Sequence, residues 1–327
     1  MSRVAEKSFY RKEGEEKPRR SHRKPSAGQR SKRPRLASKE RTRTWGTGAP
    51  GAPVLFAAES GTLPYTSRMF RTRFKKDIVA EFLPPVRGRK RQRVILLCDG
   101  MPGMPRKQGL AEFLAGKGYW VFYPRWRGAW ESDGEFLEKS PEEDLRDVMD
   151  ELPKGVREAA FGKKFKLSPD EIFVIGGSFG GTAAILASLD ARVKKVIANC
   201  PVVDWSILGK EQKKETSNPS YVSYIREAFG NGYRLSEKNW NKLHSGVFYN
   251  PVQHVRELSA EKILMFHAKD DPYVPWRSVS RFAEKAGIRL HLFARGGHLS
   301  TEMVVQKYWE RIERFFDEFS PSANALG

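Results

Sequence analysis

The stretch from Asp170 to Leu189 constrains the fold more than any other part of the chain. Ile172 to Ile175 is a short apolar run with β-branched residues, which predicts a buried strand. A glycine-rich turn with Ser178 at its centre follows at once. The segment from Thr182 to Leu189 is rich in alanine and leucine and predicts a helix. A strand, a sharp glycine turn that carries a serine, and a helix are the context of a G-x-S-x-G nucleophile elbow.

The small residues around Ser178 suit a reactive serine. Such a serine has to stand clear of the sheet in a strained turn, and glycines keep the strand and helix from colliding with it. Phe179 would then present its backbone N–H to a developing oxyanion. The alternative is a glycine turn of a nucleotide-binding protein, which requires G-x-G-x-x-G spacing and an acidic residue about 20 positions later. The glycines at 176, 177, 180 and 181 do not have that spacing, so the nucleophile interpretation is favoured.

Apolar runs alternate with helical segments along most of the chain, which predicts an α/β fold with a mostly parallel sheet covered by helices on both faces. A capping box at Ser140 predicts a helix that ends near Leu152, where Pro153 interrupts it. The spacing of Val304, Tyr308, Ile312, Phe315 and Phe319 predicts one amphipathic C-terminal helix. The predicted strands are Pro53 to Ala58, Asp77 to Leu83, Val94 to Cys98, Tyr119 to Tyr123, Val193 to Ala198, Lys262 to Phe266 and Arg289 to Phe293, and Leu110 to Ala115 is a further helix.

Residues from about 205 to 260 do not follow this alternation. They are helical in pattern and rich in aromatic side chains. They lie between the strand after the glycine turn and the strand that precedes the candidate acid described next. We therefore expect a helical cap over the site, inserted into a domain that spans residues 51–327. The alternative is a set of surface helices with no role at the site.

The remaining members of a catalytic triad occur in the required order. A serine nucleophile needs a base within hydrogen-bonding reach and an acid that orients the base, and in α/β-hydrolases the chain order is serine, acid, histidine. Asp270 and Asp271 directly follow one predicted strand, and His298 follows the last one in a glycine-rich loop. Both loops are expected at the carboxyl edge of the sheet, where the turn of Ser178 also lies.

Composition divides the chain into two parts. Residues 1–50 contain 16 Lys and Arg against 5 Asp and Glu, in a chain whose net charge is +20. This segment has too few apolar residues to offset the entropy of ordering it, so we expect a disordered basic tail that makes weak, nonspecific contacts with polyanions. The two cysteines, Cys98 and Cys200, make no disulfide framework and favour a reducing, cytoplasmic location. No apolar run is long enough for a membrane span, and no secretory signal is visible.

Four stretches of the chain resemble the catalytic domain of the prolyl oligopeptidase-type serine peptidases, over about residues 77–319. They are YPRWRGAWESDGEF at Tyr123 to Phe136, GGSFGG at Ser178, HAKDDPYVP at Asp271 and GGH at His298. The resemblance implies the α/β-hydrolase fold, with Ser178 as nucleophile and His298 as base. The D-x-x-V-P pattern of that family selects Asp271 over Asp270 as the acid.

The resemblance also suggests an oxyanion hole. Members of this family usually have His-Gly-Gly-Pro where this chain has Asp99-Gly100-Met101-Pro102. By that match Met101 supplies a second backbone donor beside Phe179. Asp99 departs from the pattern, and a carboxylate that pointed into the hole would oppose an oxyanion.

The implied activity is hydrolysis of short peptides through an acyl-enzyme, with no metal or organic cofactor. Trp126, Trp130 and Trp205 follow predicted strand ends and are expected to line the substrate pocket, although they could equally pack within the cap. A carboxylesterase with the same triad is the first alternative. The second is a catalytically inactive hydrolase fold that binds nucleic acid through its basic tail, which the presence of Ser178, Asp271 and His298 argues against.

Overall fold

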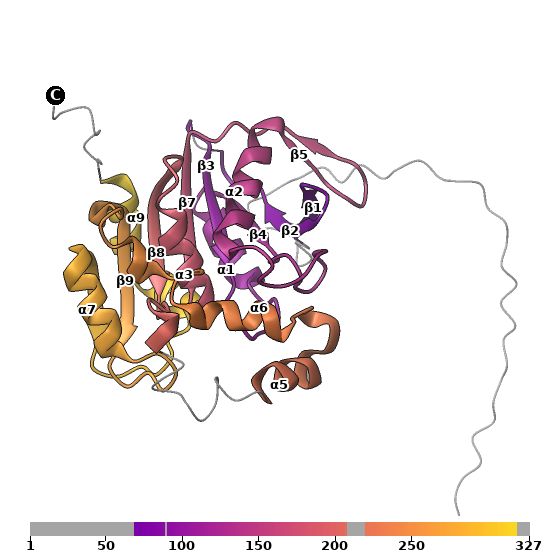
Figure 1. Cartoon of the computed structure of the whole chain (residues 1–327). Coiled ribbons are helices and arrows are strands. Elements are labelled where there is room, and N and C mark those ends of the chain that lie inside the picture. Colours follow the sequence, from indigo (N-terminus) through magenta and orange to yellow (C-terminus); the bar gives the residue numbers. More distant parts are fainter. Residues whose placement is uncertain (1–68, 89, 208–219, 319–327) are drawn as a thin grey trace, which may run out of the picture. The chain divides into compact units, whose positions relative to one another are not determined.

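An eight-stranded sheet lies at the centre of the protein, in the order β1-β2-β4-β3-β7-β8-β9-β10 (Figure 1). The pairings β4–β3, β3–β7, β7–β8, β8–β9 and β9–β10 are parallel, and β2 pairs antiparallel with both β1 and β4. The mostly parallel sheet predicted from the sequence is therefore confirmed. Its strands are β1 (Phe70–Phe74), β2 (Ile78–Leu83), β3 (Arg93–Cys98), β4 (Trp120–Pro124), β7 (Glu171–Gly177), β8 (Val193–Asn199), β9 (Ile263–Ala268) and β10 (Arg289–Phe293).

This computed structural model describes residues 69–88, 90–207 and 220–318. They belong to one compact unit, Thr62–Gly327. The predicted basic tail and the predicted strand from Pro53 to Ala58 lie outside the described residues. Within the described part, no helix is both long and apolar enough to cross a membrane.

Helices cover both faces of the sheet because its central strands are apolar on both sides. All six residues of β3 are buried: Val94, Leu96 and Cys98 belong to one hydrophobic cluster, and Ile95 and Leu97 to the other. The first cluster includes residues of α2 (Pro141–Glu151), α3 (Phe179–Ala187) and α7 (Trp276–Ala286). The second includes residues of α1 (Gln108–Gly116), α8 (Thr301–Lys307) and α9 (Trp309–Asp317).

The prediction of one continuous C-terminal helix was wrong. The chain bends at Tyr308, where φ is −108° and ψ is 23°, and the helix divides into α8 and α9. The bend lets two neighbouring aromatic rings face different partners. Tyr308 packs on Phe266 of β9, whereas Trp309 packs on Phe113 of α1.

The segment between β8 and β9 is helical in its described part, with α5 and α6 as its main helices (Figure 1). It begins after β8 ends at Asn199, and residues 208–219 lie outside the description. A short β5–β6 hairpin, α7 and β1 are elements that the sequence patterns did not predict. The remaining elements are η1 (Leu152–Lys154), β5 (Val156–Arg157), β6 (Lys164–Phe165), α5 (Ser220–Phe229), η2 (Gly230–Gly232), α6 (Glu237–Asn241), η3 (Lys242–Ser245), η4 (Pro251–His254) and η5 (Ala260–Lys262).

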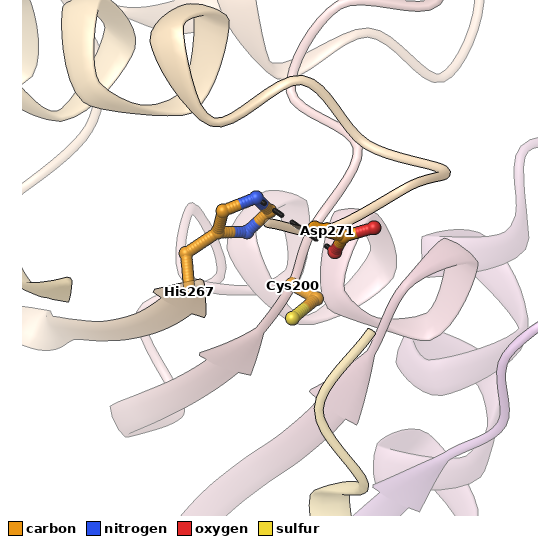
Figure 2. A group of neighbouring side chains, drawn as sticks. All are labelled: Cys200, His267 and Asp271. Carbon is orange, nitrogen blue, oxygen red and sulfur yellow. Dashed lines mark ion pairs between the residues drawn. The ribbon is translucent and has the colours of Figure 1, made fainter. Parts of the chain in front are cut away.

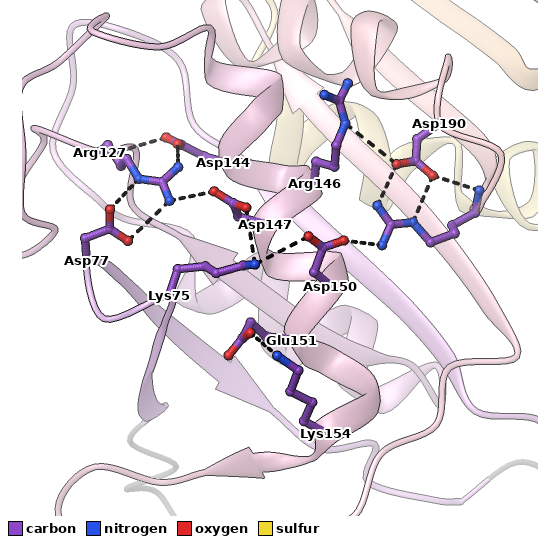
Figure 3. A network of polar contacts seen from close by, with 11 residues as sticks. Lys75, Asp77, Arg127, Asp144, Arg146, Asp147, Asp150, Glu151, Lys154 and Asp190 are labelled. Atoms are coloured by element: carbon purple, nitrogen blue, oxygen red, sulfur yellow. Dashed lines mark hydrogen bonds and ion pairs between the residues drawn. The ribbon is translucent and has the colours of Figure 1, made fainter.

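An ionic network fixes the loop that follows β4 (Figure 3). Arg127, whose side chain is 12% exposed, forms ion pairs with Asp77 at 2.6 Å, with Asp147 at 2.6 Å and with Asp144. Asp144 and Asp147 belong to α2, and Asp77 lies in the turn between β1 and β2. One guanidinium therefore ties the loop to both the helix and the edge of the sheet.

Candidate active site

Ser178 occupies a strained turn between β7 and α3. Its backbone has φ 54° and ψ −120°, a conformation that L-residues adopt only when the surroundings impose it. The flanking glycines are sterically required. A Cβ at Gly176 would lie 2.0 Å from the carbonyl oxygen of Gly180, and one at Gly180 would lie 2.5 Å from the carbonyl oxygen of Asp99. The local sequence thus permits the tight turn that a nucleophile elbow requires.

The backbone N–H of Phe179 is a suitable donor to an oxyanion. Phe179 is the first residue of α3, so its N–H has no partner within the helix and lies at the positive end of the helix dipole. Its carbonyl oxygen accepts a hydrogen bond of 2.6 Å from the hydroxyl of Tyr249, which belongs to the segment between β8 and β9. This contact fixes the residue next to Ser178.

Asp271 and His298 form a hydrogen-bonded pair. His298 Nδ1 lies 2.8 Å from Asp271 Oδ2, and the other carboxylate oxygen accepts N–H groups of Tyr273 at 2.8 Å and Val274 at 3.0 Å. The carboxylate is fully buried, whereas the imidazole is 26% exposed. Burial acts to raise the pKa of Asp271, but the hydrogen bonds from His298 and from these backbone groups outweigh it and hold the pKa below its usual value. An ionised carboxylate in this position orients the imidazole.

Asp270 makes a different contact. Its Oδ1 accepts the backbone N–H of Gly297 at 2.8 Å, and this bond lowers the pKa of the exposed Asp270 carboxyl. Asp270 therefore holds the loop that carries His298, while Asp271 contacts the imidazole itself.

Asn199, at the end of β8, joins the turn of Ser178 to the loop of His298. Its carbonyl oxygen accepts the N–H of Ser178 at 2.8 Å, and its side-chain Nδ2 donates to the carbonyl oxygen of Leu299 at 2.6 Å. Among the described residues, no direct hydrogen bond joins the hydroxyl of Ser178 to His298; such catalytic contacts are often long until substrate binds. The sequence patterns did not point to Asn199, because a buried asparagine at a strand end carries no motif.

The loop after β3 places Gly100, the neighbour of Met101, beside Ser178. A Cβ built on Gly100 would lie 3.5 Å from Cβ of Ser178, so this loop runs against the turn. The carboxylate of Asp99 is occupied: it accepts from the hydroxyl of Tyr123 at 2.5 Å and from the N–H of Gly100 at 3.1 Å. It also pairs with Lys107 at 3.5 Å, so a nearby cation balances its charge.

The three tryptophans lie around Phe179 and the loop after β3. Trp126 and Trp205 are 3% and 8% exposed, and their rings lie 6.0 Å and 5.8 Å from that of Phe179. Trp130 is half-buried and donates from Nε1 to the carbonyl oxygen of Gly103 at 3.1 Å. Trp126 and Trp205 thus pack against the ring of Phe179, and their role in a substrate pocket stays a prediction.

Cys200 and His267 lie beside Asp271, with one ligand atom of each of the three residues within 4.8 Å of the others (Figure 2). His267 is fully buried, and its Nε2 lies 3.0 Å from the carbonyl oxygen of Val274 and 3.8 Å from Asp271. Burial raises the pKa of the Cys200 thiol, and the charge of Asp271 raises it further. A metal ion would bind the thiolate form of Cys200, which the raised pKa disfavours. Both oxygens of Asp271 already accept hydrogen bonds. Cys200 and His267 are therefore better suited to supporting the carboxylate of Asp271 than to binding a metal ion.

Comparisons with known proteins agree with this architecture. The family model described as the prolyl oligopeptidase family matches residues 107–320. None of the curated proteins compared matches the sequence. An esterase of Pyrococcus furiosus superposes with a TM-score of 0.53 at 16% identity, covering 76% of this chain and 89% of its own.

Two further solved structures have a similar fold. Acylaminoacyl peptidase of Pyrococcus horikoshii has a TM-score of 0.54 at 18% identity, over 78% of this chain and 42% of its own. Est1E of Butyrivibrio proteoclasticus with ferulic acid bound has a TM-score of 0.55 at 15% identity, over 76% of this chain and 99% of its own. At these identities the likeness concerns the fold, which is that of the α/β-hydrolases.

Proposed function

Because the chain belongs to the prolyl oligopeptidase family and is a serine hydrolase, we propose that it cleaves amide bonds of short peptides through an acyl-enzyme on Ser178. The observation that carries this proposal is the Asp271–His298 hydrogen bond of 2.8 Å, with the loop of His298 tied through Asn199 to a serine that has positive φ. A buried carboxylate, an imidazole and a strained serine at one sheet edge are the groups that acyl transfer requires.

The reaction proceeds in two steps. His298 takes the proton of Ser178 as the hydroxyl oxygen attacks the substrate carbonyl, and Asp271 stabilises the imidazolium that forms. The N–H groups of Phe179 and Met101 stabilise the tetrahedral oxyanion, each contributing about 3–4 kcal/mol. His298 then returns the proton to the leaving amine, and water hydrolyses the acyl-enzyme by the same route.

A fluorophosphonate probe tests the nucleophile. It is expected to label wild-type protein at Ser178 and to leave Ser178→Ala unlabelled. Equal labelling of the two proteins would contradict the assignment. Wild-type protein that resists the probe, although it is folded and monodisperse, would favour the inactive binding protein instead.

Paired substrates test the bond that is cleaved. Aminoacyl-naphthylamides and p-nitrophenyl acyl esters pass through the same acyl-enzyme chemistry but differ in their leaving groups. We expect both to be hydrolysed, since a peptidase that expels an amine also expels a phenolate. Ester hydrolysis with no measurable amide hydrolysis, both dependent on Ser178, would establish the carboxylesterase alternative.

A further inference from the structure

The loop that carries Met101 is held at both ends. At one end, Gly100 lies against Ser178. At the other end, Gly103 has both of its backbone polar groups bound by side chains. Its N–H donates to the hydroxyl oxygen of Tyr233 at 3.1 Å, and its carbonyl oxygen accepts from that hydroxyl at 3.0 Å and from Trp130 Nε1 at 3.1 Å. One tyrosine hydroxyl thus acts as donor and acceptor to the same residue.

Tyr233 belongs to the segment between β8 and β9, and packing contacts hold it in place. The residue is 3% exposed, and its ring packs 5.2 Å from Phe136 and 5.7 Å from Phe229. Its backbone forms an isolated bridge with Ala129. The hydroxyl therefore reaches Gly103 from a rigid support.

Backbone hydrogen bonds attach this part of the segment to the loop after β4. Trp130 N donates to the carbonyl oxygen of Gly232 at 2.8 Å, and Arg234 N donates to that of Gly128 at 2.7 Å. The loop after β4 also carries Arg127, which the ionic network fixes to α2. This rigid framework holds Tyr233 and Trp130, and their side chains in turn fix the position of Gly103.

From these contacts we infer that Tyr233 is a positioning residue for the oxyanion hole: it sets the backbone of Met101 by holding Gly103. Met101 lies between Gly100 and Gly103, so two fixed ends determine the direction of its N–H. Displacement of such a donor by about 1 Å costs roughly 100-fold in rate. Burial raises the pKa of Tyr233 to about 12, so the hydroxyl stays protonated at neutral pH. This inference rests on the proposed function, because Met101 is the proposed second oxyanion donor.

The test is Tyr233→Phe, which removes the hydroxyl and keeps the ring. We expect kcat on a small neutral substrate to fall at least about tenfold, with KM changed less than about twofold, because the hole acts in the transition state. The pH profile is expected to keep its shape, since the Asp271–His298 pair is untouched. Tyr221→Phe is the matched control: its ring lies in the same segment but stacks on Trp240, and its kcat should equal that of wild type.

A peptide aldehyde adds a second measurement. It reacts reversibly with the serine to give a hemiacetal oxygen in the oxyanion hole, so its Ki should rise by about the factor by which kcat/KM falls. An unchanged kcat and Ki in Tyr233→Phe would overturn the inference, as would a rise in KM at constant kcat, which would make Tyr233 a substrate contact.

Two comparisons keep the outcome decisive. If Tyr233→Phe does not fold, Trp130→Phe removes the other donor to Gly103 and should show the same loss of kcat at constant KM; normal kcat in that variant would overturn the inference. The proposed function fails on different evidence. It fails if wild-type protein hydrolyses no amide, whereas the inference fails if wild type is active on an amide or an ester and the variants match it.

Discussion

Two buried aspartates of this protein, Asp271 and Asp144, have pKa values that are shifted in opposite directions. Asp271 receives His298 Nδ1 and the N–H groups of Tyr273 and Val274, and its pKa is lowered. Asp144 receives the N–H and the guanidinium of Arg127. Burial raises the pKa of Asp144 to about 6 in spite of these contacts.

Burial is the largest contribution to the pKa of both carboxyls, and the charge of Asp77 raises the pKa of Asp144 further. Asp77 and Asp147 also pair with Arg127, so three carboxylates share its guanidinium, and Asp147 pairs with Lys75 as well (Figure 3). At Asp271 the hydrogen bonds from the partly exposed imidazole of His298 and from two backbone N–H groups outweigh burial. The first arrangement fixes a loop, and the second fixes the imidazole of His298.

The largest expected effect is on catalysis by Asp271. Asp271→Asn should lower kcat by about 10³- to 10⁴-fold, because an amide no longer stabilises the imidazolium or the correct tautomer. Asp270→Asn is the matched control and should lower kcat less than about tenfold, since Asp270 contacts the N–H of Gly297. Steady-state kinetics on one small substrate measures both. Equal losses, or the reverse order, would show that the wrong carboxylate has been assigned.

Arg127→Met should have the largest effect on stability. It leaves the buried carboxylate of Asp144 without its cation, and breaking a buried pair typically costs about 3–5 kcal/mol of unfolding free energy. Arg289→Met is the control: its partnership with Glu318 involves side chains that are 50% and 44% exposed, and it should cost less than about 1 kcal/mol. Urea unfolding at neutral pH measures both. Similar losses would refute the distinction between a buried and an exposed pair.

The raised pKa of Asp144 predicts a pH dependence of stability. A folded-state pKa of about 6 exceeds the unfolded value of about 3.9. The protonated acid therefore stabilises the fold fully below about pH 4, and this contribution is lost as pH rises through 6. Unfolding free energies of wild type and Asp144→Asn, measured from pH 4 to 7.5, should differ in slope over that interval. Parallel curves would mean that the pKa of Asp144 is not raised.

The smallest expected effect is at Arg192. It pairs with Asp190 at 2.7 Å and with Asp150 at 2.7 Å on the surface, and its hydrogen bonds lower the pKa of both carboxyls. Arg192→Gln should cost about 0.5–1 kcal/mol at pH 7. Because depressed carboxyl pKa values stabilise the fold above about pH 3.9, the difference from wild type should vanish as pH falls below that value. A cost that persists at pH 2.5 would point to lost packing instead.

Local sequence determined the parts of the site that depend on neighbouring residues. The glycines around Ser178 predict the strained turn because only glycine avoids the clashes that a Cβ would make there. The strand runs before Asp271 and His298 predict loops at one sheet edge, because parallel strands end together. The mostly parallel sheet was likewise predictable, because hydrophobic periodicity and apolar runs can be read from short stretches of sequence.

Contacts between distant segments were decided only by the tertiary structure. Gly103 and Tyr233 are 130 residues apart, and no sequence motif around either residue indicates that they are in contact. Asn199 forms a hydrogen bond with Leu299, 100 residues away in the sequence. Arg127 forms ion pairs with three carboxylates, one in the β1–β2 turn and two in α2. The break at Tyr308 also depends on contacts between distant segments. Helical spacing predicted one helix, but the adjacent rings of Tyr308 and Trp309 pack on different elements, β9 and α1. Hydrogen bonding and packing across the fold depend on which surfaces come together, and that information is spread over the whole chain.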